Sequence, residues 1–134
     1  NPSLAQNRAT SDRFICNGRR VLNQQASTNS KKVYGYDFVY QQAPSYFPQM
    51  PNKYDPTGSF QPLAYHTGDI QFVFPGWHGG HLGVNLDQIT GQPRELQGAE
   101  IALSDQIVAA WTNFAKTGDP NGPGVPEWPA FSMK

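Results

Sequence analysis

Apolar residues recur at helical spacing in two stretches of the chain, separated by a region rich in proline and glycine. The first stretch predicts a helix over residues 11–25, which Gly18 weakens by about 1 kcal/mol relative to alanine. The second predicts a longer helix over residues 94–117, with one apolar face that we expect to lie in the core. That face comprises Leu96, Ala99, Leu103, Ile107, Ala110, Trp111 and Phe114. Gly118 suits the left-handed position after the last turn, and Pro120 prevents the helix from continuing.

A different pattern, short and rich in β-branched and aromatic residues, predicts a strand over residues 33–40 (VYGYDFVY). Apolar residues lie on both of its faces, which is typical of a strand in a sheet covered by helices, although Asp37 conflicts with this. One strand cannot form a sheet. The pattern therefore indicates that the rest of the sheet is supplied from outside this sequence.

The segments between these elements are predicted to be loops. Residues 41–62 carry five widely spaced prolines, which exclude regular structure and favour a long ordered loop. Residues 66–74 (HTGDIQFVF) predict a loop leading into a short helix, and residues 75–91 a second, glycine-rich loop. The order of elements is thus helix, strand, loop, short helix, loop and long helix.

Length and charge restrict the classes of function. The 134 residues are enough for one domain, and ten basic residues balance ten acidic ones. A neutral chain gives no electrostatic reason to bind nucleic acid, and no apolar run is long enough for a transmembrane helix. The start of the sequence has neither an initiator methionine nor a signal-peptide pattern, so we expect a fragment or a processed chain. The single cysteine, Cys16, cannot form an internal disulfide and is expected to be a buried thiol.

Four motifs in a fixed order resemble the type-B carboxylesterase and cholinesterase family. Residues 111–121 (WTNFAKTGDPN), followed by the Trp-Pro pair at 128–129, are similar to a signature near the family's C-terminus. Residues 66–74 resemble the segment that holds the family's catalytic histidine. Residues 33–40 and the SDRFIC segment at 11–16 match in order and approximate spacing. The resemblance covers most of the chain and identifies it as the C-terminal portion of such a protein.

This resemblance implies an α/β fold, namely the C-terminal part of an α/β-hydrolase, with few strands, several helices and long Pro/Gly-rich loops. It implies that residues 1–134 form one segment of that domain and do not complete the sheet. His66 aligns with the histidine of a Ser–acid–His triad, and Asp69 with an acid of the polar network around it. The family implies no cofactor and no metal, and favours a secreted or periplasmic location.

A histidine suits this role because neutral imidazole can take the proton of a serine hydroxyl as it attacks an ester carbonyl. No G-x-S-x-G elbow occurs in the sequence, and no segment matches the family's acid. We therefore expect the chain alone to be inactive. Its expected partner is the remainder of the esterase, with the serine and the acid, and its expected substrate is a small ester.

Other interpretations stay open. The same fold occurs in non-catalytic adhesion or binding proteins, and a secreted binding module built on the aromatic loops is a further alternative. His66 would then be a histidine at a helix start satisfied by solvent or backbone, and Asp69 a first-turn acid favoured by the helix dipole. His78 and His81 have a spacing that permits metal binding, but without companion ligands we expect them in a surface loop.

Overall fold

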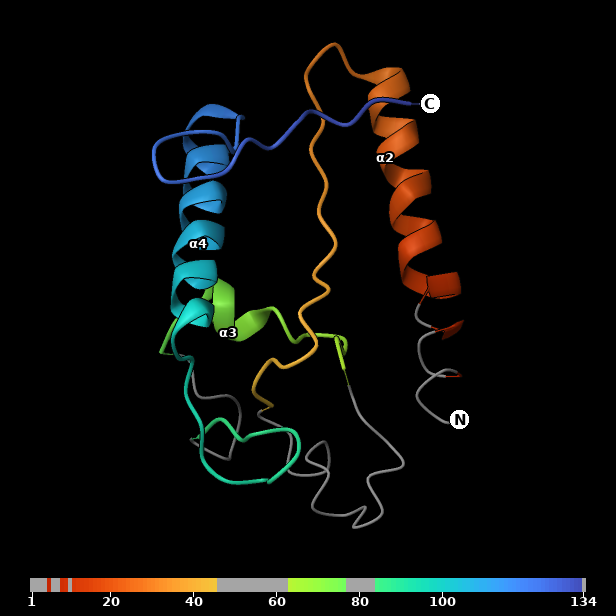
Figure 1. Cartoon of the computed structure of the whole chain (residues 1–134). Helices are drawn as coiled ribbons and strands as arrows, with labels where there is room; N and C mark the ends of the chain where they lie inside the picture. The colour runs from red at the N-terminus through yellow and green to blue at the C-terminus, as the bar shows by residue number, and fades with distance from the viewer. Residues whose placement is uncertain (1–4, 6–7, 10, 46–62, 77–83, 134) are drawn as a thin grey trace. The chain divides into compact units, whose positions relative to one another are not determined.

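The computed structural model describes residues 5, 8–9, 11–45, 63–76 and 84–133. These residues belong to two compact units. Their described residues fall within 38–105 in the first unit, and within 5–37 and 106–133 in the second. Figure 1 labels the three α-helices, α2, α3 and α4, along the chain.

The N-terminal helix is confirmed. It begins as one turn of π-helix, η1 (Ser11–Ile15), and continues as α2 (Cys16–Thr28), three residues beyond the predicted end at residue 25. No residue of α2 is buried, so Cys16 is exposed and the expectation of a buried thiol is wrong. Leu22 of α2 packs closely on Gly35, where an added Cβ would lie 2.6 Å from Leu22 Cδ1.

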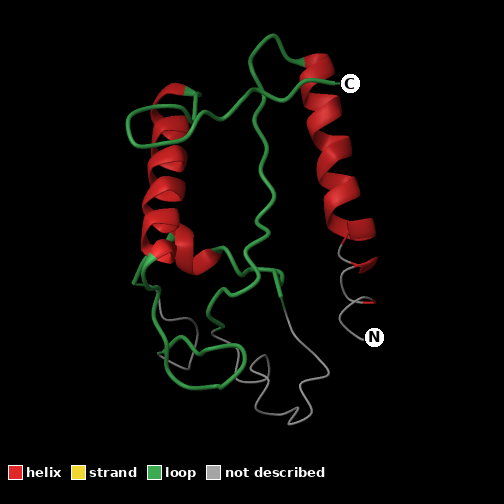
Figure 2. Cartoon of the chain, in the orientation of Figure 1, coloured by secondary structure: helices red, strands yellow, loops and turns green. Residues whose placement is uncertain are grey.

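The predicted strand at residues 33–40 is not formed, and Figure 2 shows this segment as a loop. Among the described residues the only β pairing is two isolated antiparallel bridges, from Leu86 to Ser45 and to Pro93. A strand needs a neighbour that pairs with its backbone along its length. Here the tail supplies a backbone bond, from Phe131 N–H to Val33 O at 2.7 Å, but no ladder forms among the described residues. Residues 33–40 therefore have the composition of a strand, but the described residues contain no neighbouring strand with which they could pair.

The long helix is confirmed as α4 (Ala99–Thr117), but it begins later than predicted from residue 94. The backbone before it is used by the bridge between Leu86 and Pro93, and Arg94 N–H donates to Asn85 O at 2.8 Å. The C-terminal end is as expected. Gly118 has φ +76°, and its N–H donates to Phe114 O at 2.8 Å.

The apolar face of α4 is only partly a core. Ala110 is 2% exposed, but Trp111 is 46% and Phe114 is 49% exposed, so the expectation that both lie in the core is wrong. Each makes an edge-on contact with one ring of the extended segment, Trp111 with Tyr36 and Phe114 with Tyr34, both at 6.1 Å. The described residues of this unit are too few to cover the rest of either ring.

The C-terminal tail is fixed by the side chain of Asn121. Its Oδ1 accepts the Trp128 N–H at 2.7 Å, and its Nδ2 donates to Trp128 O at 2.9 Å. Asp119 Oδ1 in turn accepts the backbone and side-chain N–H groups of Asn121 at 2.9 and 2.7 Å. Trp128 donates its indole N–H to Gly35 O at 3.1 Å. These bonds explain why the Gly-Asp-Pro-Asn and Trp-Pro segments occur together.

Candidate functional site

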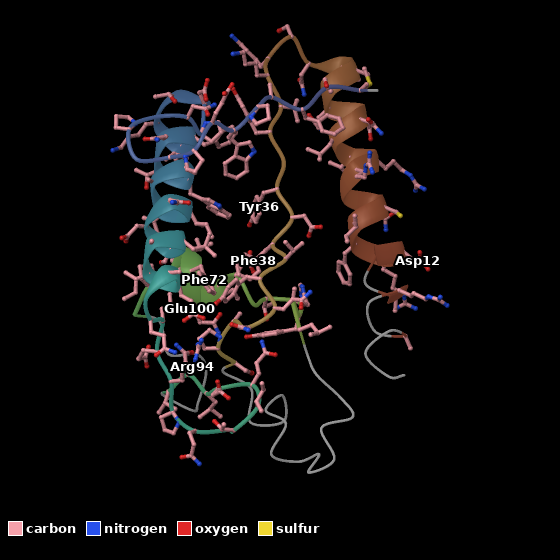
Figure 3. All side chains as sticks on the ribbon, in the orientation of Figure 1. Asp12, Tyr36, Phe38, Phe72, Arg94 and Glu100 are labelled. Carbon is pink, nitrogen blue, oxygen red and sulfur yellow. The ribbon has the colours of Figure 1, made fainter. Side chains whose placement is uncertain are left out.

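The candidate site is built on α3 (Ile70–Val73), the short helix predicted after residue 66. Phe72 is completely buried, with the ring of Phe38 at 5.0 Å and that of Tyr40 at 5.6 Å. Figure 3 labels Phe38 and Phe72 together in this cluster. Ser104, near the start of α4, donates its hydroxyl to Phe72 O at 2.8 Å. The single turn of helix is therefore held by aromatic packing and by α4.

His66 lies in the turn that leads into α3, and its side chain is exposed. Gly68 N–H donates to Tyr65 O at 3.0 Å, and Ile70 N–H donates to Thr67 O at 3.1 Å. Thr67, directly after the histidine, has φ +74°, and Leu63 has φ +57°. Positive φ is unusual for any residue with a Cβ and most unfavourable for a β-branched one. The turn that presents His66 is thus strained on both sides.

Gly68 is favoured by close packing within the same turn. A Cβ at this position would lie 3.1 Å from Tyr65 O and 3.4 Å from Tyr65 Cε1. The first of these contacts is with backbone, which cannot move as freely as the end of a side chain. The glycine therefore lets the turn close against Tyr65.

The buried backbone at Pro44 holds this turn in place through hydrogen bonds. The Tyr65 hydroxyl donates to Pro44 O, and Gln71 Nε2 donates to the same oxygen at 3.1 Å. Gln88 Nε2 joins the two segments again, donating to Ala43 O at 2.6 Å and to Leu63 O at 3.2 Å. The polar anchors therefore lie on both sides of His66 in the sequence.

Asp69 is the N-cap residue of α3. Its backbone is helical, with φ −79° and ψ −16°, and its carbonyl accepts the N–H groups of Phe72 and Val73 at 2.9 and 3.0 Å. Its carboxylate makes no capping hydrogen bond to this helix, and its side chain is half-buried. The structure therefore places Asp69 on the same turn as His66.

A charged network that the sequence did not reveal lies at the start of α4. Glu100 is 3% exposed and accepts from Arg94 Nη2 at 2.5 Å, from the Tyr40 hydroxyl at 2.9 Å and from Gln97 N–H at 3.0 Å. Burial and the hydrogen bond to Glu100 raise the pKa of Tyr40. Figure 3 labels Arg94 and Glu100. No spacing in the sequence distinguishes these two residues from ordinary surface charges, whereas Gln71 was detectable as a polar residue inside an apolar run.

Asp87 extends this network toward solvent, with Oδ2 at 3.6 Å from Arg94 Nε. Partial burial acts to raise the pKa of Asp87. The backbone N–H groups of Thr90 and Ile89, the Thr90 hydroxyl and the Arg94 charge outweigh it and hold this pKa below its usual value.

Clusters of metal ligands, long apolar helices and surface hollows are the further features that bear on other classes of site. Within the described ranges, no group of three or more His, Cys, Asp or Glu side chains could hold a metal ion. His78 and His81 lie outside the described residues. None of the helices described is long and apolar enough to cross a membrane. A surface hollow of about 420 Å³ lies in the second unit, and its lining includes Lys32, Tyr34, Glu127 and Trp128 but no serine, cysteine or histidine among the described residues.

Comparison with known proteins now places the chain. Residues 4–134 match the model of the carboxylesterase family, and the chain therefore belongs to that family. The family implies the α/β-hydrolase fold, which agrees with the predicted fold class at that level. The few strands expected within this chain are not formed among the described residues, which are helical or irregular.

Curated relatives agree. The chain is 43% identical over 70 residues to carboxylesterase 5A of Canis lupus familiaris, which is 52% of this chain and 11% of that protein. It is 38% identical over 65 residues to acetylcholinesterase of Gallus gallus (45% and 8%), and 32% identical over 103 residues to carboxylesterase 1F of Mus musculus (74% and 14%). The matched stretches thus span about a tenth of the length of these relatives. No solved structure gives a significant match.

Proposed function

We propose that this chain supplies the catalytic histidine and the last helices of a carboxylic-ester hydrolase, with His66 as the general base of a Ser–acid–His triad. The observation that carries the proposal is the strained turn. An exposed imidazole lies directly before a threonine at φ +74°, in the turn that leads into a short helix whose residues Gln71 and Phe72 are buried. Strained backbone of this kind persists only where the surrounding structure enforces it, and it is concentrated at functional sites.

The chemistry follows from the triad. As the serine oxygen attacks the ester carbonyl carbon, His66 takes the hydroxyl proton, and the carbonyl π pair moves to oxygen. When the tetrahedral intermediate collapses, the C–O bond to the alcohol breaks, and the imidazolium gives its proton to that alcohol. A water molecule, deprotonated by the same imidazole, then attacks the acyl-serine. The second collapse releases the acid and restores the serine. No cofactor or metal enters this cycle.

Asp69 has a supporting role in this proposal. Its position as N-cap of α3 puts a carboxylate on the turn that carries His66, where it contributes to the polar surroundings of the imidazole. The triad acid itself precedes the histidine in this family and is not Asp69. We therefore expect Asp69→Asn to lower activity far less than loss of His66.

The serine, the triad acid and the oxyanion donors are proposed to lie in the remainder of the esterase, which is the principal partner of this segment. The sequence contains no G-x-S-x-G elbow. The isolated chain is consequently expected not to hydrolyse esters. Turnover of a simple aryl acetate by the pure 134-residue chain, lost in His66→Ala, would contradict this.

The test uses the intact esterase, a simple aryl ester and the variant His66→Ala. We expect kcat/KM to fall by about 10⁴-fold or more, as it does when a triad base is removed. His81→Ala is the matched control, since it removes a histidine with no assigned role, and it should stay within twofold of wild type. If the intact wild-type protein neither hydrolyses esters nor reacts with a fluorophosphonate serine probe, the adhesion or binding alternative replaces the esterase.

A further inference from the structure

Two side-chain donors that flank the candidate base converge on one buried carbonyl. Tyr65 directly precedes His66, and Gln71 follows the turn on α3. Both donate to Pro44 O, from a segment more than twenty residues upstream. We propose that Tyr65 and Gln71 are positioning residues that together hold the His66 turn in its productive geometry. This inference rests on the proposed role of His66.

The Tyr65 hydroxyl, the Gln71 side-chain amide and the Pro44 carbonyl oxygen each lie within hydrogen-bond distance of the other two, and so form a triangle. Gln71 Nε2 lies 3.1 Å from Pro44 O and 3.5 Å from the Tyr65 hydroxyl oxygen, and that hydroxyl donates to the same Pro44 O. Gln71 is 1% exposed, and Pro44 is fully buried. Hydrogen bonds in such surroundings are stronger than in water, and losing them is costly. The triangle is therefore a rigid tie between the start and the end of the turn.

Stability alone does not explain the choice of glutamine at position 71. Its neighbours on α3 are Ile70, Phe72 and Val73, and its own Oε1 is buried without a partner among the described residues. A methionine of similar size would leave no such atom. A buried polar group with an unmet hydrogen bond lowers stability, so the benefit of Gln71 lies in what Nε2 holds.

The hydrogen bonds of Tyr65 and Gln71 to Pro44 O matter because the backbone between these two residues is strained. Thr67 and Leu63 both have positive φ, a conformation that each residue would leave if its surroundings permitted. Relaxation of either residue rotates the backbone that carries His66. A displacement of about 1 Å at a catalytic group can lower a rate by about 100-fold. Tyr65 and Gln71 lie on the two sides of Thr67, and their bonds to Pro44 O oppose its relaxation.

The experiment measures kcat and KM of the intact esterase for an aryl ester in Tyr65→Phe, Gln71→Met and the double variant. Each single change leaves Pro44 O with one of the two donors, so we expect a modest loss of kcat, about fivefold, with KM within twofold of wild type. The double change removes both donors. We expect it to lower kcat by at least 100-fold, more than the product of the single effects.

A fluorophosphonate serine probe separates positioning from loss of fold. Its final stoichiometry counts folded sites, and its reaction rate reports assistance by the histidine. We expect full stoichiometry and a slowed rate in the double variant. If Gln71→Met yields no labelled protein, Tyr65→Phe alone decides, since it removes one hydroxyl and must still lower kcat per labelled site.

Asn113→Leu is the matched control. Its amide donates to another proline carbonyl, Pro120 O, at 3.3 Å in the second unit. It should leave kcat per labelled site within twofold. Wild-type kcat per labelled site in the double variant, or an equal loss in Asn113→Leu, overturns the positioning role while His66→Ala still tests the triad. Full activity in His66→Ala overturns both proposals.

Discussion

The carboxylate of Glu100 should be the most sensitive polar group of the first unit to truncation. It is 3% exposed and accepts three donors, from Arg94, Tyr40 and Gln97. Replacing it with alanine leaves those three donors without this acceptor and leaves the Arg94 charge, whose side chain is 15% exposed, without its closest anion. The start of α4 and the segment carrying Arg94 should both loosen.

The magnitude follows from the burial of the pair. Removing one partner of a buried ion pair costs about 3–5 kcal/mol, because the remaining charge is left in a poor solvent. The partial exposure of Arg94 favours the lower end, about 3 kcal/mol. Since about 1.4 kcal/mol corresponds to a factor of ten, local opening should become about 100-fold more frequent.

Hydrogen exchange of the intact protein, read by mass spectrometry, measures this directly. Peptides covering the start of α4 should exchange about 100-fold faster in Glu100→Ala. Asp105→Ala, an exposed acid on the same helix, is the control and should change exchange less than threefold. Exchange in Glu100→Ala within threefold of wild type would refute the claim that this network holds the helix start.

Three further outcomes are expected. Gly68→Ala should lower esterase activity about tenfold, because its Cβ would lie 3.1 Å from Tyr65 O. Gly18→Ala is the control, since an added Cβ would have nothing within 4 Å, and it should leave activity unchanged. Equal effects of the two substitutions would contradict the packing argument. Asp87→Asn should destabilise the protein above the usual carboxyl pKa of about 3.9, and less as pH falls through the lowered folded pKa, so urea midpoints of variant and wild type should converge once pH is below that folded pKa. The isolated chain should bind the dye ANS strongly, because Val39 is 65% and Trp111 is 46% exposed; binding no greater than that of a typical folded protein would contradict this.

Local signals in the sequence were sufficient for the helices and for the family. Gly118 ended α4 as expected, because the left-handed conformation at that position depends on one residue. The short helix after His66 was likewise predictable from its apolar run. The four ordered motifs predicted the family, and the family match over residues 4–134 confirms it.

Features that depend on distant partners were predicted poorly. Residues 33–40 have the composition of a strand, but pairing requires neighbours that the described residues do not contain. Trp111 and Phe114 have the spacing of core residues, yet burial depends on what covers them. The start of α4 was misplaced because Pro93 and Arg94 are used by a bridge to a segment that the helical pattern cannot reveal.

In the candidate site, too, residues within one motif were predictable and contacts between distant segments were not. His66 and Asp69 are three residues apart and could be identified from one motif. The anchor at Pro44 O, and the network of Arg94 and Glu100, join residues whose proximity exists only in the fold. Polar residues inside apolar runs, such as Gln71, are the signal by which similar anchors could be found.

The most direct test of the account is chemical rescue of His66→Ala in the intact esterase. The substitution removes a ring of the size of imidazole, so added imidazole should occupy the space that it leaves. We predict that hydrolysis of an aryl ester falls by about 10⁴-fold or more in the variant and rises again with imidazole concentration near neutral pH. Wild-type activity in His66→Ala without imidazole would contradict the central claim that this histidine is the base of the triad.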